Sequence, residues 1–160
     1  MKRALSVAVC IGAIALPAVA LAGLTPDPEY GGRIDGKKNH YLGFDVKGSG
    51  NDRKIKNGFV RNIKLKCNNP DDNGTEGGTL EKAVPVKPDG SFDKTVQYDF
   101  DPPMPPRGGG ATGIRYRLKG ELKGDKASGF IEVELFGTGG CHSGKQDFEV
   151  KKPAPPVPPS

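Results

Sequence analysis

The sequence predicts an all-β protein: a single antiparallel β-sandwich or flattened barrel of about eight strands, with one disulfide. Apolar side chains recur at every second position in one segment after another, which is the period of a half-buried strand. Helical spacing is almost absent, and turn-forming residues separate the alternating segments, since the chain holds 24 glycines and 15 prolines. This pattern and a length of 160 residues exclude a coiled coil and a large α/β enzyme.

The first 22 residues are expected to form a signal peptide. Lys2 and Arg3 precede an apolar run, and Ala20-Leu21-Ala22 is a small-x-small cleavage motif. The run is shorter than a stable membrane span, which makes an uncleaved anchor the less favoured alternative. We therefore expect cleavage, export to the cell envelope or beyond the cell, and no membrane span in the mature chain. Residues 23–27 would be a short lead.

The predicted β-domain covers residues 28–151, and alternation defines its strands in order. Leu42, Phe44 and Val46 share one parity, for example, while their neighbours are polar or small. Strands with one apolar and one wet face are typical of antiparallel sheets. The candidate strands are 30–34, 42–46, 54–60, 63–67, 80–87, 92–100, 114–122, 131–135 and 145–150.

A tight hairpin turn is predicted at Gly124-Asp125-Lys126, because glycine and aspartate tolerate the dihedral angles of such turns. A hairpin centred on Asp125-Lys126 would place Lys119 opposite Glu132 and Arg117 opposite Glu134. Cross-strand pairs of opposite charge contribute only about 0.2–1 kcal/mol each, but they help to fix the register.

Three segments are predicted to lack regular structure. Residues 68–79 and 101–111 read as long loops, and the second is rich in proline and then glycine. Residues 152–160 read as a proline-rich, extended and disordered tail.

Two cysteines, Cys67 and Cys141, remain once Cys10 leaves with the signal peptide. Oxidising compartments favour a disulfide between them, and two free thiols or an intermolecular pair are the alternatives. The bridge would close a loop of about 74 residues, which the chain-entropy model values at roughly 4 kcal/mol.

The histidines are His40 and His142, and neither suggests a catalytic site. Cys141-His142-Ser143 puts candidate groups side by side, but adjacent residues of an extended chain point to opposite faces. A nucleophilic triad needs those groups aimed at one another. We therefore expect no enzyme activity and no cofactor.

One loop resembles the start of a calcium-binding loop, with oxygen-bearing side chains at Asn69, Asp71 and Asn73. The calcium-loop pattern requires aspartate at the first position and glutamate at the twelfth, where this chain has Asn69 and Leu80. A mobile polar loop is therefore favoured over a metal site.

A candidate ligand surface combines basic and aromatic side chains. Basic residues share outward parity on two predicted strands and would form a positive stripe if these strands are neighbours, although Glu132 and Glu134 would neutralise part of it. Aromatic rings that stack on sugars or bases are the other device by which sheets hold polymers. The mature net charge of about +3 is too mild for a dedicated nucleic-acid binder. The candidate residues are Lys64, Lys66, Arg115 and Arg117 for the stripe and Tyr30 and Tyr41 as aromatic platforms.

Several short motifs resemble those of small secreted β-proteins of actinobacteria, a group without an assigned activity. They are Tyr30-Gly31-Gly32, Cys67, Asp89-Gly90-Ser91-Phe92, the set Gly120, Gly124, Ala127 and Gly129, and the block Gly140-Cys141-His142-Ser143-Gly144. Phe148 stands where similar sequences have tryptophan. The resemblance implies a disulfide-stapled β-fold in the cell envelope or outside the cell, and it implies no chemistry.

The resulting hypothesis is an exported, non-enzymatic β-domain that acts by binding or as a structural module, with a cell-wall polymer or a secreted protein as partner. One alternative is a secreted hydrolase inhibitor that inserts the 101–111 loop into its target. A glycan hydrolase with paired carboxylates is the other, although alternation alone does not place two carboxylates at a catalytic distance.

Overall fold

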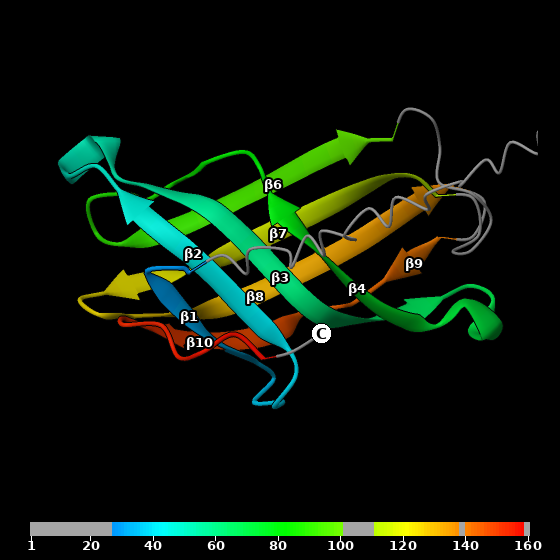
Figure 1. Ribbon diagram of the computed structural model, residues 1–160. Helices are drawn as coiled ribbons and strands as arrows, with labels where there is room; N and C mark the ends of the chain where they lie inside the picture. The colour runs from blue at the N-terminus through cyan, green and yellow to red at the C-terminus, as the bar shows by residue number, and fades with distance from the viewer. Residues whose placement is uncertain (1–26, 101–110, 138–139, 159–160) are drawn as a thin grey trace, which may run out of the picture.

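The computed structural model describes residues 27–100, 111–137 and 140–158, and this part of the chain is built from β-strands without an α-helix (Figure 1). The expected signal peptide, residues 23–26 of the lead and most of the 101–111 loop lie outside the described residues. The strands are β1 Tyr30–Ile34, β2 Tyr41–Lys47, β3 Lys54–Cys67, β4 Gly74–Leu80, β5 Val84–Pro85, β6 Ser91–Asp99, β7 Ala111–Lys123, β8 Lys126–Gly137, β9 Cys141–His142 and β10 Gln146–Lys151.

All strand pairs are antiparallel, and the sheet closes on itself. Its order is β10-β1-β2-β3-β9-β8-β7-β6, and β10 also pairs with β8. Six strands therefore form a closed barrel, from which β7 and β6 continue beyond β8 while β4 and β5 pair with β3. Figure 1 shows the flattened result, in which β2 and β3 cross in front of β6, β7 and β8. The predicted all-β class and barrel architecture are confirmed.

The strand count and several boundaries differ from the prediction. The described residues form ten strands, because β4 lies almost entirely within the expected 68–79 loop and the two-residue β9 was not predicted. The expected strands 54–60 and 63–67 form one strand, β3, with an irregularity at Asn62, whose φ is 56°. The candidate 80–87 shrinks to β5. The alternation signal failed at β4 because Gly-Thr-Glu-Gly-Gly-Thr-Leu has a single large apolar side chain.

The β7–β8 hairpin turns one residue earlier than predicted, which shifts the cross-strand register by two residues. Its two central residues are Gly124 and Asp125, with Lys123 opposite Lys126, and Gly124 has the positive φ of 61° that favours glycine first in such a turn. The register is therefore corrected: Arg117 lies opposite Glu132, not Glu134. A slip of two residues preserves the side-chain parity, so the expected outward residues remain outward.

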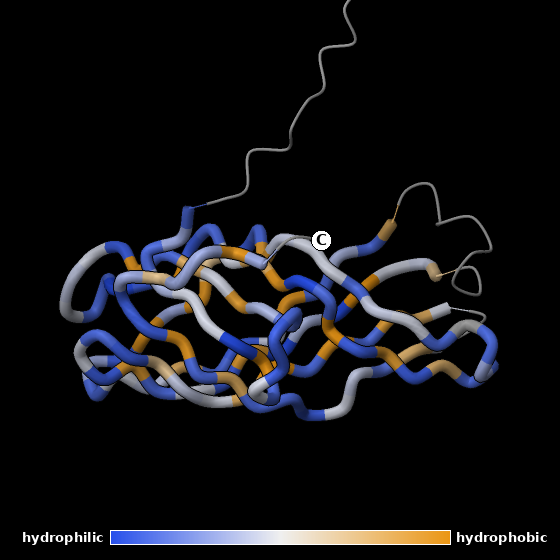
Figure 2. Tube along the Cα trace, turned by 60° about the horizontal axis from the view of Figure 1, so that its bottom comes forward, coloured by the Kyte–Doolittle hydropathy of each residue, from blue (hydrophilic) through white to orange (hydrophobic). Residues whose placement is uncertain are grey.

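The inward side chains of the flattened barrel form one core between its two opposing walls. Figure 2 shows the hydrophobic positions alternating with hydrophilic ones along the strands.

Cys67 and Cys141 are direct cross-strand partners on β3 and β9, and their disulfide confirms the predicted pairing. Within the described residues no helix is long and apolar enough to cross a membrane. The largest fully buried side chains are Phe44, Phe92, Ile34, Leu42, Ile55, Ile63, Leu118 and Ile131.

Residues 153–158, called the tail segment below, lie against the barrel instead of extending free of it. The Tyr41 hydroxyl donates a hydrogen bond to the Pro155 carbonyl at 3.0 Å, and Arg61 Nη1 donates to the Pro158 carbonyl at 3.0 Å. Figure 1 shows this red segment turning back after β10 and crossing β1 towards β2. The expectation of a disordered tail is therefore corrected over these residues.

Candidate ligand-binding face

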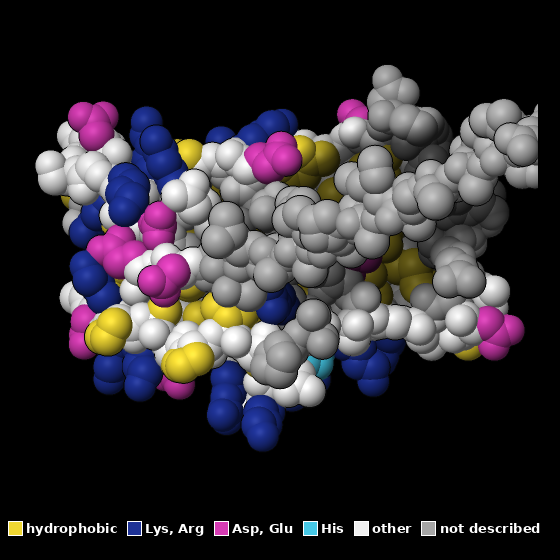
Figure 3. Space-filling model, in the orientation of Figure 1, with side chains coloured by type: hydrophobic (Ala, Val, Ile, Leu, Met, Phe, Trp, Pro, Cys, Tyr) yellow, Lys and Arg dark blue, Asp and Glu magenta, His cyan; other side chains and the backbone are white. Residues whose placement is uncertain are grey.

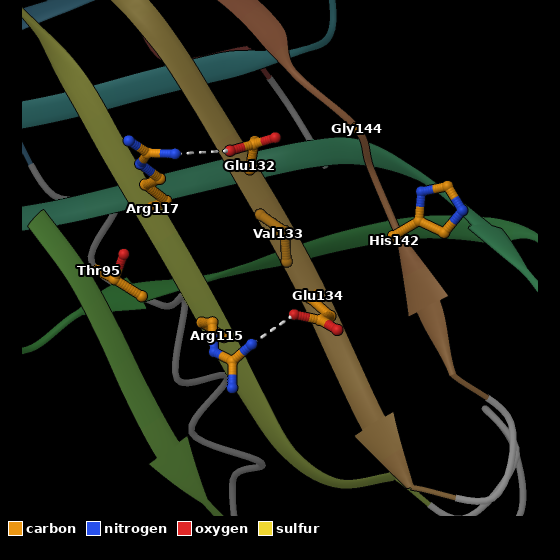
Figure 4. Close-up of a pocket in the computed structure, with 8 residues that line it drawn as sticks. All are labelled: Thr95, Arg115, Arg117, Glu132, Val133, Glu134, His142 and Gly144. Carbon is orange, nitrogen blue, oxygen red and sulfur yellow. Dashed lines mark hydrogen bonds and ion pairs between the residues drawn. The ribbon is translucent and has the colours of Figure 1, made fainter.

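The outer side of β6, β7, β8 and β9 carries an open hollow of about 250 Å³ (Figure 4). Four strands contribute to it because neighbouring strands of the sheet present their outward residues side by side. The hollow and its strands are called the β6–β9 face below. Its lining residues are Thr95, Arg115, Arg117, Glu132, Val133, Glu134, His142 and Gly144.

Two arginines on β7 organise the charges of this face. Arg117 donates to both carboxylate oxygens of Asp93 at 3.1 Å and approaches Glu132 at 3.8 Å. The hydrogen bond from Arg117 lowers the pKa of Asp93, and this contact also raises the pKa of Arg117. Arg115 donates to Glu134 at 2.9 Å and to the side-chain oxygen of Gln97 at 3.1 Å.

One row of this face crosses five strands in register. Lys66 on β3 lies opposite His142 on β9, His142 lies opposite Glu134 on β8, and Glu134 lies opposite Arg115 on β7. Gln97 on β6 completes the row. The structure thus places the predicted residues Lys66 and Arg115 on one face, separated by the imidazole and the carboxylate. Sequence parity alone did not identify His142 as the link between them.

Lys64 shares the outward parity of Lys66 and is exposed. It lies opposite Thr75 on β4, and its carbonyl oxygen accepts a hydrogen bond from the buried Gln146 side chain at 2.8 Å. The predicted positive stripe is therefore interrupted: acidic residues and His142 stand between its β3 part and its β7 part.

The segment after β9 borders the hollow and is hydrogen-bonded to β8. Ser143 satisfies both backbone groups of Val133, as a residue of a neighbouring strand would. Its backbone N–H donates to the Val133 carbonyl, and its hydroxyl accepts from the Val133 N–H, both at 2.8 Å. Gln146 Nε2 also donates to the Ser143 carbonyl at 3.4 Å. Gly144 then follows with a φ of 62° and lines the hollow, and a Cβ at this position would meet no atom within 4 Å.

Two outward phenylalanines, Phe130 and Phe136, flank the hollow on β8, and sequence reasoning missed them. Arg117 lies 5.6 Å and Lys145 lies 5.0 Å from the Phe130 ring centroid, and Arg115 lies 5.7 Å from that of Phe136. Cation–π contacts at exposed sites contribute about 0.5–1 kcal/mol each. The signal was available, because both residues share the parity of Glu132 and Glu134.

The predicted aromatic platforms Tyr30 and Tyr41 are both buried. Tyr30 is 6% exposed, belongs to the barrel core and donates its hydroxyl to the Gly124 carbonyl at 3.0 Å. Tyr41 is 2% exposed although it points outward, because the tail segment covers it. Burial raises the pKa of both phenols. Neither ring is available for stacking on a ligand in this structure, which corrects the expectation.

The other candidate groups are placed as follows. Cys141 is buried in the disulfide while His142 is exposed, so the Cys141-His142-Ser143 block does not converge on one point. Asn69 accepts from the Asp71 N–H at 3.3 Å, and Asn73 accepts from the Cys67 N–H at 2.8 Å, so both amide oxygens stabilise the turn at Pro70–Asp72. Among the described residues, no three His, Cys, Asp or Glu side chains gather at one metal-binding point.

His40 lies apart from the β6–β9 face. It is half-buried, desolvation lowers its pKa, and its buried Nδ1 has no hydrogen-bond partner within the described residues.

The chain was compared with protein-family models, with curated proteins and with solved structures, and none of them matches it.

Proposed function

We propose that this protein is an exported, non-enzymatic binding module whose β6–β9 face holds a polar polymer of the cell wall. The observation that carries the proposal is the five-strand row from Lys66 to Gln97, beside a hollow that two phenylalanines flank. Export remains inferred from the apolar N-terminus, and the disulfide is compatible with it.

The row alternates groups that donate with groups that accept hydrogen bonds. Lys66 and Arg115 donate, Glu134 accepts, and His142 and Gln97 each have both capacities. A polymer rich in hydroxyl groups requires such mixed partners along its length, whereas a purely anionic polymer would favour an unbroken basic stripe. The interrupted charge pattern therefore supports a sugar-like polymer over a nucleic acid.

The spacing of Phe130 and Phe136 indicates how long a ligand the β6–β9 face can hold. Phe130 and Phe136 are six residues apart on one strand, a separation of roughly 20 Å at about 3.3 Å per residue. Rings at both ends and hydrogen-bonding groups between them suit an extended chain laid along β8, rather than a small molecule enclosed in a pocket.

The acidic residues of this face support binding more than hydrolysis. Glu132 and Glu134 are two residues apart on the same side of β8, and each approaches an arginine. A glycan hydrolase needs one carboxyl group with a raised pKa that donates a proton to the leaving group. Here each of the two carboxylates faces an arginine, an arrangement that suits holding a ligand rather than transferring a proton to it.

The proposal is tested by cosedimentation of the purified protein with insoluble cell wall and a panel of insoluble polysaccharides, at low salt and at 1 M salt. At 1 M salt the screening length falls to about 3 Å, so attraction between exposed charges is largely suppressed. We expect binding that survives 1 M salt and weakens about tenfold or more in Arg115→Gln and in Phe136→Ala.

Arg33→Gln is the matched control, since Arg33 is an exposed arginine on β1, away from the hollow. It should bind like the unsubstituted protein. Binding that disappears at 1 M salt, or that Arg33→Gln and Arg115→Gln weaken equally, would contradict a specific face. Release of soluble sugar into the supernatant would contradict the non-enzymatic part of the proposal.

A further inference from the structure

The outer side of β1, β2 and β3 carries a second and chemically different surface. Tyr41 and Phe59 stack with their centroids 5.8 Å apart, and both are buried, yet neither belongs to the core cluster between the layers. Arg61 lies directly opposite Tyr41 in the β2–β3 ladder. Gly31, Tyr41, Gly43, Phe59 and Arg61 are called the tail-covered face below.

Two glycines let these rings lie flat on the sheet. A Cβ atom at Gly31 would overlap the Tyr41 hydroxyl, and one at Gly43 would lie 2.6 Å from the Phe59 ring. Larger residues at both positions would push the rings off the strands. The sheet is therefore shaped here to present two aromatic side chains broadside, which is a costly arrangement unless something covers them.

The tail segment is that cover, and it contacts the face through its backbone. The hydrogen-bonded carbonyls belong to Pro155 and Pro158, three residues apart. A polyproline II helix has three residues per turn and no internal hydrogen bonds, so carbonyls three residues apart point to the same side and need outside donors. Tyr41 and Arg61 are placed one strand apart as those two donors.

Side-chain contacts and a flanking ion pair complete the fit. The Cβ of Ala154 would lie 2.9 Å from a Cβ at Gly31, which shows that the tail segment passes directly over this glycine. Just before the tail segment, Lys152 pairs with Glu29, and its N–H donates to the Asp125 carbonyl at 2.8 Å. Figure 3 views this side of the molecule: hydrophobic side chains gather near its lower edge, with Lys and Arg outside them.

We propose that the tail-covered face is a binding site for proline-rich segments in the polyproline II conformation, and that residues 153–158 occupy it as a built-in ligand. An aromatic surface with two hydrogen-bond donors spaced for carbonyls i and i+3 is the arrangement by which proteins recognise such segments. A proline-rich segment of another protein chain is the external ligand, and it binds where the tail segment has left. This inference rests on other strands than the proposed polymer-binding face and does not depend on it.

The test uses the full chain with Pro155, Pro156 and Pro158 all changed to glycine, called the release variant. Glycine keeps the carbonyls but removes the preset φ, so the segment loses its preorganisation while the barrel is untouched. The probe is a synthetic peptide with the sequence of residues 152–160, followed by calorimetry and by amide shifts of Gly31, Gly43 and Arg61 in NMR spectra. Dispersed β-sheet amide signals verify that the release variant is folded.

We expect the peptide to bind the release variant and to leave the unsubstituted protein unchanged at micromolar concentrations, because a tethered segment competes at an effective concentration of about millimolar. Adding Arg61→Ala to the release variant should weaken the peptide about tenfold. Tyr41→Phe should weaken it as well, whereas Tyr30→Phe, the matched phenol in the core, should leave it unchanged.

Three results would overturn the proposal. The first is that the release variant binds no peptide, and the second is that it binds a peptide with glycines in place of the prolines equally well. The third is that Arg61→Ala weakens binding no more than Arg115→Ala, which changes an arginine on the β6–β9 face. A second measurement uses Tyr41, whose pKa burial raises. In the release variant, the pKa of Tyr41 should move back towards the ordinary value of 10.0, and added peptide should raise it again.

Discussion

The two outer faces of this barrel are built from the same alternating pattern of strand residues, yet they differ in solvent exposure. On the tail-covered face, Tyr41 and Phe59 are 2% and 4% exposed. On the β6–β9 face, the side chains of Arg115 and Glu134 are 45% and 51% exposed. Glycine neighbours let rings lie flat and accept a covering segment, whereas covering ion pairs would remove charges from water at a high cost. Outward parity therefore predicts where a side chain points, and its neighbours decide whether solvent reaches it.

The largest effect on stability is expected from removing the disulfide that joins β9, a strand of the β6–β9 face, to β3. Replacing Cys67 and Cys141 with alanine should lower the free energy of unfolding by roughly 2–5 kcal/mol, because the unfolded chain loses its cross-link. Urea denaturation measures this loss, and the unsubstituted protein in reductant is the control. Hydrogen exchange should accelerate at His142 and Ser143 before it does at Tyr41. Equal acceleration on both faces would contradict a local role for the bridge.

A matched pair of truncations measures the difference between the faces directly. Phe59→Ala removes a ring buried under the tail-covered face and should cost about 3 kcal/mol. Phe136→Ala removes a half-buried ring beside Arg115 and should cost about 1 kcal/mol. Urea denaturation of both variants supplies the comparison. If the two losses were equal, the covering segment would contribute nothing to the burial of Phe59.

The smallest effect concerns the ion pair that precedes the tail segment. The Lys152 contact and the Val46 N–H, at 3.1 Å, lower the pKa of Glu29 from 4.5. A lowered folded-state pKa means that this carboxylate stabilises the fold above about pH 4.5 and that the contribution is lost as pH falls through the folded-state pKa.

Glu29→Gln should therefore be less stable than the unsubstituted protein at neutral pH, and the two should converge in acid. Thermal unfolding between pH 3 and pH 7 would show this convergence, a pH range chosen to span the ordinary carboxyl pKa of about 4. Glu121→Gln, which removes the exposed partner of Lys123 on β7, is the control and should run parallel to the unsubstituted protein. A constant difference between Glu29→Gln and the unsubstituted protein at every pH would contradict the assignment.

Alternation sufficed for the long strands and for the disulfide, but not for features that depend on distant segments. β7 and β8 were predicted because each has an unbroken period of two, and their outward charges survived the two-residue correction of the register. β4 was missed because its glycines and threonines carry no apolar period. Tyr41 was expected to be open because no local pattern shows that residues over 110 positions later cover it.

The candidate site was predictable in part. Arg115, Arg117 and Lys66 were correctly placed on outward parity. Joining Lys66 and Arg115 in one row required His142 on β9, a two-residue strand too short to show a period. Phe130 and Phe136 could have been found by extending the parity of Glu132 in both directions along β8.

The closure of the barrel by its last strand also governs how the chain can fold. Gly31 on β1 lies opposite Lys151 on β10, so the first and last strands of the domain are hydrogen-bonded neighbours. During synthesis β1 has no partner on that side until the ribosome has released almost the whole domain, and unpaired strand edges of this kind invite association between nascent chains. Because β1 and β10 are neighbours, a short linker could join the N-terminal and C-terminal ends of the domain. New termini could then be opened at the Gly124-Asp125 turn. Such a circular permutant would place β8, β10 and β1 close together early in its sequence. The pairing of β1 with β10, which joins distant segments of the native chain, would then become local.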